Sequence, residues 1–126
     1  MTYDFTQAQA FFAAKTGFTT EPYELKDRLD AGEPLHVVDV RFPADFRKGH
    51  IPGAVNMPKG KWERPEDFLS KDKLNVLYCY NQACHKAARA AVLALAKGYR
   101  VIEVEGGFDT WENAGYPVEA SSARAA

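Results

Sequence analysis

Apolar positions along the chain fall into short runs, separated by longer segments in which apolar residues recur with a helical period. Residues 35–40 form a nearly continuous apolar and β-branched run, and 74–78 are similarly apolar, a pattern typical of strands buried in a parallel sheet. Shorter runs at 18–19, 54–57 and 100–104 predict further strands. We therefore expect a central sheet of about five short strands.

Helices are predicted between these strands, several of them ending at a glycine. Thr20 is the expected N-cap of the second helix, and Gly32 ends it. The predicted helices lie at 2–15, 21–31, 43–48, 87–97 and after the glycine pair at 106–107, with one helical turn within 58–69.

Two of these helices have an apolar face that should be covered. In the first, Phe5, Ala8, Phe11 and Phe12 share one side, so we expect it to pack on the domain or on a second subunit. The helix at 87–97 is rich in alanine. Its predicted inward residues are Ala88, Ala91, Val92 and Leu95.

Strands that alternate with helices predict an α/β fold, in which a parallel sheet carries helices on both faces. We expect one domain over 18–119, a helical extension over 1–17 and a flexible tail over 120–126. Ligand sites in such sheets lie at the carboxyl ends of the strands. Cys79 follows the strand at 74–78 directly, so it is expected at this edge.

Composition narrows the class of protein. The chain has 126 residues, 46% of them apolar and 26% charged, which suits one folded domain and excludes disorder throughout. A formal net charge of -1 argues against nucleic-acid binding. No run is long enough to span a membrane, and residues 1–18 do not resemble a signal peptide, so we expect a cytoplasmic protein that does not bind membranes. Two cysteines are too few for a disulfide framework.

The position of Cys79 favours a nucleophile. Amide groups in the first turn of a helix lack intrahelical partners, and the helix dipole adds positive potential there, so both favour the thiolate. The same amides can hold an anion. The predicted anion-binding loop comprises Tyr80, Asn81, Gln82, Ala83, Cys84, His85 and Lys86.

Three stretches of sequence together resemble a single-domain rhodanese, a family of sulfurtransferases. The first is Asp-Val-Arg at 39–41 followed by Gly-His-Ile-Pro-Gly-Ala at 49–54. The second is Leu-Tyr-Cys at 77–79, and the third runs from Glu-Gly-Gly-Phe at 105–108 to Gly-Tyr-Pro-Val at 115–118. The resemblance covers residues 20–118.

This resemblance implies that Cys79 accepts sulfane sulfur from a donor such as thiosulfate, holds it as a persulfide and passes it to cyanide, a thiol or a protein acceptor. It implies no cofactor or metal, and a monomer or homodimer. Asp39 and Arg41 are expected to support the site, with Arg41 paired to Asp45. His50 and Trp111 are expected to be structural, whereas Trp62 is a candidate for the pocket rim.

The active-site loop departs from the common family pattern because it contains a second cysteine, Cys84. Cys84 could attack the Cys79 persulfide and release sulfide, protect the thiolate by reversible oxidation, or simply replace a serine. Lys86 and Arg89 are the nearest cations.

Other classes remain as alternatives. A phosphatase or arsenate reductase with a Cys-x5-Arg loop would have arginine at the position of His85, and a thioredoxin-like site would need Cys-x-x-Cys. A zinc site would lack an obvious fourth ligand. The last alternative is a non-catalytic or redox-regulatory binding module of the rhodanese type.

Overall fold

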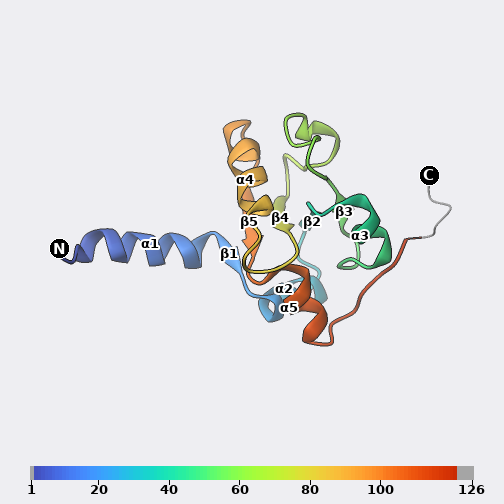
Figure 1. Ribbon diagram of the computed structural model, residues 1–126, viewed down its shortest axis with the longest axis horizontal. Helices are drawn as coiled ribbons and strands as arrows, with labels where there is room; N and C mark the ends of the chain where they lie inside the picture. Colours follow the sequence, from blue (N-terminus) through green and yellow to red (C-terminus); the bar gives the residue numbers. More distant parts are fainter. Residues whose placement is uncertain (1, 122–126) are drawn as a thin grey trace.

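The computed structural model describes residues 2–121 and has a five-stranded parallel sheet at its centre (Figure 1). The strand order is β1-β5-β4-β2-β3, which places β4 in the middle. The predicted α/β class is therefore confirmed. The strands are β1 (Thr19–Thr20), β2 (Leu35–Asp39), β3 (Val55–Asn56), β4 (Leu74–Tyr78) and β5 (Val101–Val104). The helices are α1 (Phe5–Gly17), α2 (Pro22–Asp30), α3 (Pro43–Lys48), α4 (Lys86–Ala96) and α5 (Gly107–Asn113), with a 3-10 turn η1 (Pro65–Asp67).

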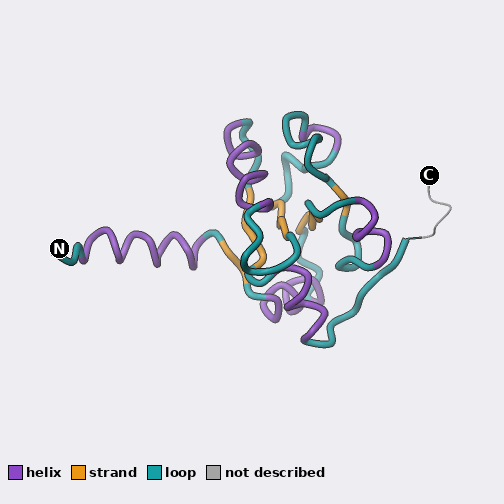
Figure 2. Tube along the Cα trace, in the orientation of Figure 1, coloured by secondary structure: helices purple, strands orange, loops and turns teal. Residues whose placement is uncertain are grey.

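The core has two parts, one on each face of the sheet. Successive residues of a strand point to opposite faces, so Val37 and Val76 enter one part while Val38 and Leu77 enter the other. Helix α4 covers the second face, and α2 and α5 cover the first. Figure 2 shows the strands enclosed between these helices. This double cover explains why β2 and β4 are apolar without alternation.

The register of the sheet brings the ends of β2 and β4 together. Asp39 pairs with Tyr78 across these strands, and the amide of Val40 donates to the carbonyl of Tyr78. The residues that follow the two strands, Arg41 and Cys79, therefore start from neighbouring points on the carboxyl edge of the sheet.

Helix α4 faces the sheet with a side that differs from the predicted one. Its buried residues are Ala87, Ala90 and Ala94, whereas Val92 is 68% exposed and Leu95 is 55% exposed. The prediction was wrong for Ala88, Val92 and Leu95, and only Ala91 is partly buried against the core. A face of three alanines lets the helix backbone approach the sheet closely, so the larger side chains remain outside.

Helix α1 projects away from the sheet (Figure 1). It begins after Asp4, whose carboxylate accepts a hydrogen bond from the amide of Gln7, and it has no buried residue. Its base is held by an ion pair of 2.9 Å between Lys15 and Glu105. The expected packing of α1 on its own domain is therefore wrong, and packing on a second subunit stays a prediction.

Element boundaries shift slightly elsewhere. Thr20, the predicted N-cap of the second helix, belongs to β1 instead. Glu21 caps α2 and forms a capping box with Glu24. Helix α3 and strand β4 have the predicted bounds. Residues 122–126 of the predicted tail lie outside the described residues. Within residues 2–121, no helix has the length and apolar character needed to cross a membrane.

Candidate active site

Cys79 follows the last residue of β4 and is 3% exposed. The first turn of α5 fixes the backbone at this point. The amide of Phe108 donates to the carbonyl of Cys79, and the amide of Asp109 donates to the carbonyl of Tyr80, both at 2.9 Å. Two amide groups at a helix start thus hold the first two residues of the loop between β4 and α4.

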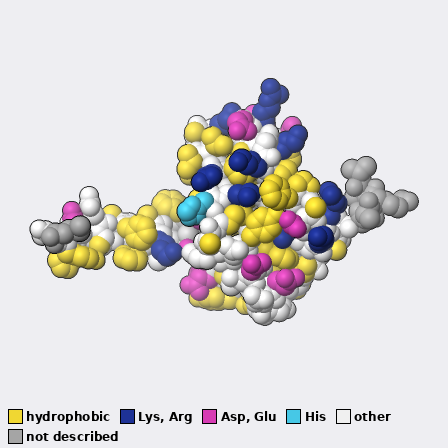
Figure 3. Space-filling view, in the orientation of Figure 1, with side chains coloured by type: hydrophobic (Ala, Val, Ile, Leu, Met, Phe, Trp, Pro, Cys, Tyr) yellow, Lys and Arg dark blue, Asp and Glu magenta, His cyan; other side chains and the backbone are white. Residues whose placement is uncertain are grey.

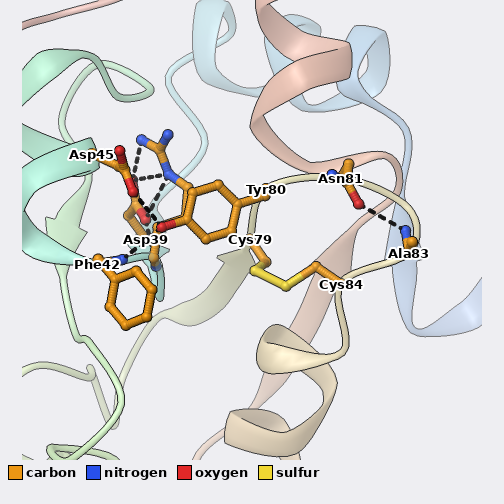
Figure 4. Close-up of a disulfide and its surroundings, with 9 residues drawn as sticks. Asp39, Phe42, Asp45, Cys79, Tyr80, Asn81, Ala83 and Cys84 are labelled. Carbon is orange, nitrogen blue, oxygen red and sulfur yellow. Dashed lines mark hydrogen bonds and ion pairs between the residues drawn. A yellow bond between two sulfur atoms is a disulfide. The ribbon is translucent and has the colours of Figure 1, made fainter.

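Cys79 and Cys84 form a disulfide in this structure (Figure 4). Their Cα atoms are 6.4 Å apart, within the range that a disulfide bridges without backbone movement. The loop is therefore curled, and its two sulfur atoms are within bonding reach of each other. This geometry disfavours the alternative in which Cys84 merely replaces a serine.

Side chains of the loop itself maintain this curl. The Asn81 side-chain oxygen accepts from the amide of Ala83 at 3.0 Å, and the Asn81 carbonyl accepts from the amide of Cys84 at 3.1 Å. The Gln82 side-chain oxygen accepts from the amide of Gly106 at 2.8 Å, which ties the loop to the start of α5. Among the described residues, the amides of Gln82 and His85 have no hydrogen-bond partner. They remain available to an anion.

Tyr80, the first residue of the predicted anion-binding loop, directs its hydroxyl toward α3. Its hydroxyl donates to the carboxylate of Asp45 and accepts from the amide of Phe42 at 3.2 Å (Figure 4). Burial and the hydrogen bond to Asp45 raise the pKa of Tyr80, so the phenol stays neutral at physiological pH. Tyr80 connects the loop to α3.

The ammonium group of Lys86 lies over an aromatic ring. Lys86 Nζ lies 5.0 Å from the ring centroid of Phe42, in a cation–π position. His85 instead lines a pocket of about 550 Å³ beside the loop, together with Gln82 and Cys84. Cys84 lines this pocket and Cys79 does not. A ligand in the pocket therefore meets the disulfide at its Cys84 sulfur.

Arg41 pairs with Asp39 and not with Asp45, which corrects the prediction. Asp39 is fully buried and Arg41 is 4% exposed. The guanidinium donates through Nη2 and Nε to Asp39 Oδ2 at 2.8 and 3.1 Å, and the Arg41 amide donates to Oδ1 at 2.8 Å. Asp45 is already occupied by Tyr80. Burial opposes the charge of Arg41, but its hydrogen bonds and attraction to Asp39 hold its pKa above the ordinary value.

Phe108 is a site residue whose role the sequence did not reveal. The Arg41 guanidinium carbon lies 4.1 Å from the ring centroid of Phe108 and 5.6 Å from that of Tyr80. Arg41 Nη2 also donates to the carbonyl of Gly49 at 2.5 Å. This cluster joins β2, α5 and the active-site loop. The only sequence signal for it was the glycine pair that precedes Phe108.

Three further residues, His50, Trp111 and Trp62, are buried in the fold. His50 stacks on Phe46 and is 4% exposed, and Trp111 is 1% exposed, both in line with the structural roles predicted for them. Trp62 is also buried, with its indole N–H donating to the carbonyl of Met57 at 2.8 Å. Its predicted place at the pocket rim was therefore wrong.

Gly107 is the tightest contact between α5 and the loop. A Cβ at this position would lie 2.7 Å from the carbonyl oxygen of Cys79, and the φ of +61° disfavours any residue with a side chain. We expect Gly107→Ala to displace the loop and to lower the free energy of unfolding, measured in denaturant, by about 1–3 kcal/mol. Gly115→Ala is the matched control, because its φ is +80° but no atom lies within 4 Å of the added Cβ. Equal losses of stability in the two variants would contradict the close-contact argument.

Comparison with known proteins identifies relatives of this arrangement. A model of the rhodanese-like domain matches residues 21–114. An HTH-type transcriptional regulator of Mycobacterium tuberculosis is 36% identical over 96 residues, which make up 76% of this chain and 42% of the regulator. A protein of Allochromatium vinosum named a sulfurtransferase is 32% identical over 97 residues, 76% of this chain and 89% of that protein. This chain thus spans less than half of the regulator and most of the sulfurtransferase.

A crystal structure of a Bacillus halodurans protein has a similar architecture. It superposes with a TM-score of 0.83 at 32% identity, and the match covers 94% of this chain and 88% of that one. Residues 18–126 make up less than nine tenths of the chain, so a match of this extent reaches into α1. At least part of the projecting helix therefore lies within the matched region.

Proposed function

Because this chain belongs to the rhodanese-like domain family, we propose that it transfers sulfane sulfur through a persulfide on Cys79. The observation that carries the proposal is the place of Cys79, directly after the central strand β4 and at the start of a loop with unpartnered amides. Relatives that are named sulfurtransferases support the class of reaction.

In the first half-reaction, the Cys79 thiolate attacks the outer sulfur of a donor such as thiosulfate. The donor's sulfur–sulfur bond breaks, sulfite leaves with the bonding electrons, and Cys79 holds the persulfide. A thiophilic acceptor, either cyanide or a thiol, then attacks the outer sulfur and regenerates the thiolate. The amides of Gln82 and His85 and the N-terminus of α4 stabilise the negative charge on sulfur throughout.

The disulfide must be reduced before this cycle can start, because Cys79 has no free thiolate while it is bonded to Cys84. The direct test is the intact mass of the reduced protein after thiosulfate treatment. We expect the mass to increase by one sulfur atom and to return to its starting value when cyanide is added. A reduced protein that gains no sulfur from thiosulfate or from an organic persulfide would contradict the proposal.

We further propose that Cys84 resolves the persulfide. The Cys84 thiolate attacks the inner sulfur, the one bonded to Cys79 Cβ, and the outer sulfur leaves as hydrosulfide. The products are the Cys79–Cys84 disulfide seen in the structure and sulfide, and the sulfane sulfur serves as the oxidant. An external dithiol restores both thiols.

Cys84→Ser is expected to stop this resolution step. The persulfide of the variant should persist until an acceptor is added, whereas the persulfide of the wild-type protein should decay with stoichiometric release of sulfide. The measurement is sulfide release by the persulfidated and desalted protein, with intact mass recorded in parallel. Equal sulfide release by both proteins would show that Cys84 does not resolve the persulfide.

A redox-regulatory binding module is the second candidate, and the disulfide favours it, because oxidation consumes the proposed nucleophile reversibly. One relative is named a transcriptional regulator, which is consistent with such a role. Sulfur transfer by the reduced protein separates the two functions, because a purely regulatory module does not turn over. The cytoplasmic location stays a prediction.

A further inference from the structure

Helix α1 exposes large aromatic side chains to solvent. Residues 5–14 carry no charged side chain. Phe5 and Phe12 lie seven residues apart on one side of the helix, with exposed fractions of 78% and 59%. Phe11, next to Phe12, is 61% exposed, and Phe18, the C-cap residue that follows the helix, is 66% exposed. Exposed phenylalanines gathered on one short segment form an apolar surface that is normally covered by a partner.

A second exposed apolar surface lies on α4. Ala88, Val92 and Leu95 follow one another at i, i+4 and i+7 along the side that faces away from the sheet. A pocket of about 550 Å³ lies between α1 and the start of this stripe. Phe11 and Phe18 line it on one side and Cys84 and Ala88 on the other, and its wall also carries polar and charged side chains, among them Lys15, His85, Glu103 and Glu105. We call these two surfaces and the pocket between them the α1–α4 corner. Figure 3 shows hydrophobic side chains along α1 and on the edge of α4 nearest to it.

We propose that a second copy of this chain covers the α1–α4 corner, with α1 of each copy lying against the corner of the other. The arrangement is isologous, since each copy supplies both the helix and the corner that receives it. The proposal does not rest on the proposed activity, but the pocket in this corner is also the one that reaches Cys84.

The exposed area is sufficient for such an interface. The four phenylalanines Phe5, Phe11, Phe12 and Phe18 are each about two-thirds exposed and together present roughly 500 Å² per copy. Two copies therefore contribute about 1,000 Å² from these rings alone, which reaches the lower bound for a specific interface. Val92 and Leu95 add to this area.

The composition of α1 favours a protein partner over a lipid surface. Helices that lie on membranes have several basic side chains on their polar face, whereas α1 has one, Lys15, and it is paired with Glu105. A helix of 13 residues is also too short to span a bilayer. The Bacillus halodurans structure, at 32% identity, matches this chain into α1. At least part of the helix thus has a counterpart in a protein of similar structure.

The test is the mass of the full chain in solution, measured by sedimentation velocity over a range of concentrations under reducing conditions. We expect a dimer whose dissociation constant rises by about tenfold or more in Val92→Asp and in Phe11→Asp. Val92→Asp leaves α1 unchanged, so it separates loss of the interface from loss of the helix. Tyr23→Asp replaces a 53% exposed aromatic residue on α2, outside the corner, and serves as the control that stays dimeric.

Three results would overturn the proposal. The first is a wild-type protein that stays monomeric at every concentration. The second is a dimer that neither Val92→Asp nor Phe11→Asp weakens. The third is a monomer that co-floats with phosphatidylcholine vesicles, which would assign the corner to a lipid surface. Circular dichroism of each variant shows whether the sheet remains folded.

Discussion

Cys79→Ser is expected to lower the rate of sulfur transfer from thiosulfate to cyanide by roughly a thousandfold or more. A serine hydroxyl is not ionised near neutral pH and forms no persulfide, so the first half-reaction has no covalent route. The substitution changes one atom at a position that is 3% exposed, so the fold should be retained. Thiocyanate formation by the reduced protein measures the effect, and intact mass shows whether sulfur is still bound.

Cys84→Ser is the matched control for this experiment, because it removes the disulfide as completely as Cys79→Ser does. It should keep the thiosulfate-to-cyanide activity of the reduced wild-type protein. The comparison separates loss of the nucleophile from loss of the bridge. Substantial thiocyanate formation by Cys79→Ser would remove Cys79 from the reaction and leave the family assignment intact.

Asp39→Ala is expected to have the largest effect on stability, a loss of about 3–5 kcal/mol in the free energy of unfolding. Asp39 is fully buried and supplies the only carboxylate that pairs with the buried Arg41 among the described residues. Removing it leaves the guanidinium with the carbonyl of Gly49 and the neighbouring aromatic rings but without a counter-charge. Such a loss is a large part of the stability of a typical domain, so unfolding in denaturant should show it clearly.

Two comparisons test the cause of that loss. The double variant Asp39→Leu/Arg41→Met removes both charges and should be more stable than Asp39→Ala, because no unpaired charge stays buried. Asp30→Ala breaks the exposed Lys26–Asp30 pair and should change the free energy of unfolding by less than about 1 kcal/mol. If Asp39→Ala is no worse than Asp30→Ala, the buried pair does not stabilise the fold.

The central strands and the place of Cys79 could be predicted because burial on both faces leaves a continuous apolar run in the sequence. Strand β4 has the predicted bounds, and β2 ends one residue earlier than predicted. The strand-to-helix position of Cys79 followed from this pattern. The motif at 49–54 and the glycine pair at 106–107 then pointed to the family that the domain match confirms.

The errors arose where the outcome depends on contacts between distant segments. In α4 either an alanine face or a larger apolar face could pack on the sheet, and the sequence alone favours the larger one. Asp45 does not pair with Arg41 because its carboxylate accepts a hydrogen bond from the hydroxyl of Tyr80, which lies 35 positions away in the sequence. The periodicity of α1 indicates that an apolar surface exists but not which molecule covers it.

The central position of β4 has a consequence for how the protein opens. Local fluctuations expose edge strands and peripheral helices first, whereas an inner strand with partners on both sides becomes accessible only when the sheet as a whole unfolds. Cys79 directly follows β4, the strand expected to open last, whereas Cys84 lies in the loop just before α4. We therefore expect the loop and the first turn of α4 to accommodate the making and breaking of the bond between them, while Cys79, the proposed nucleophile, keeps its place.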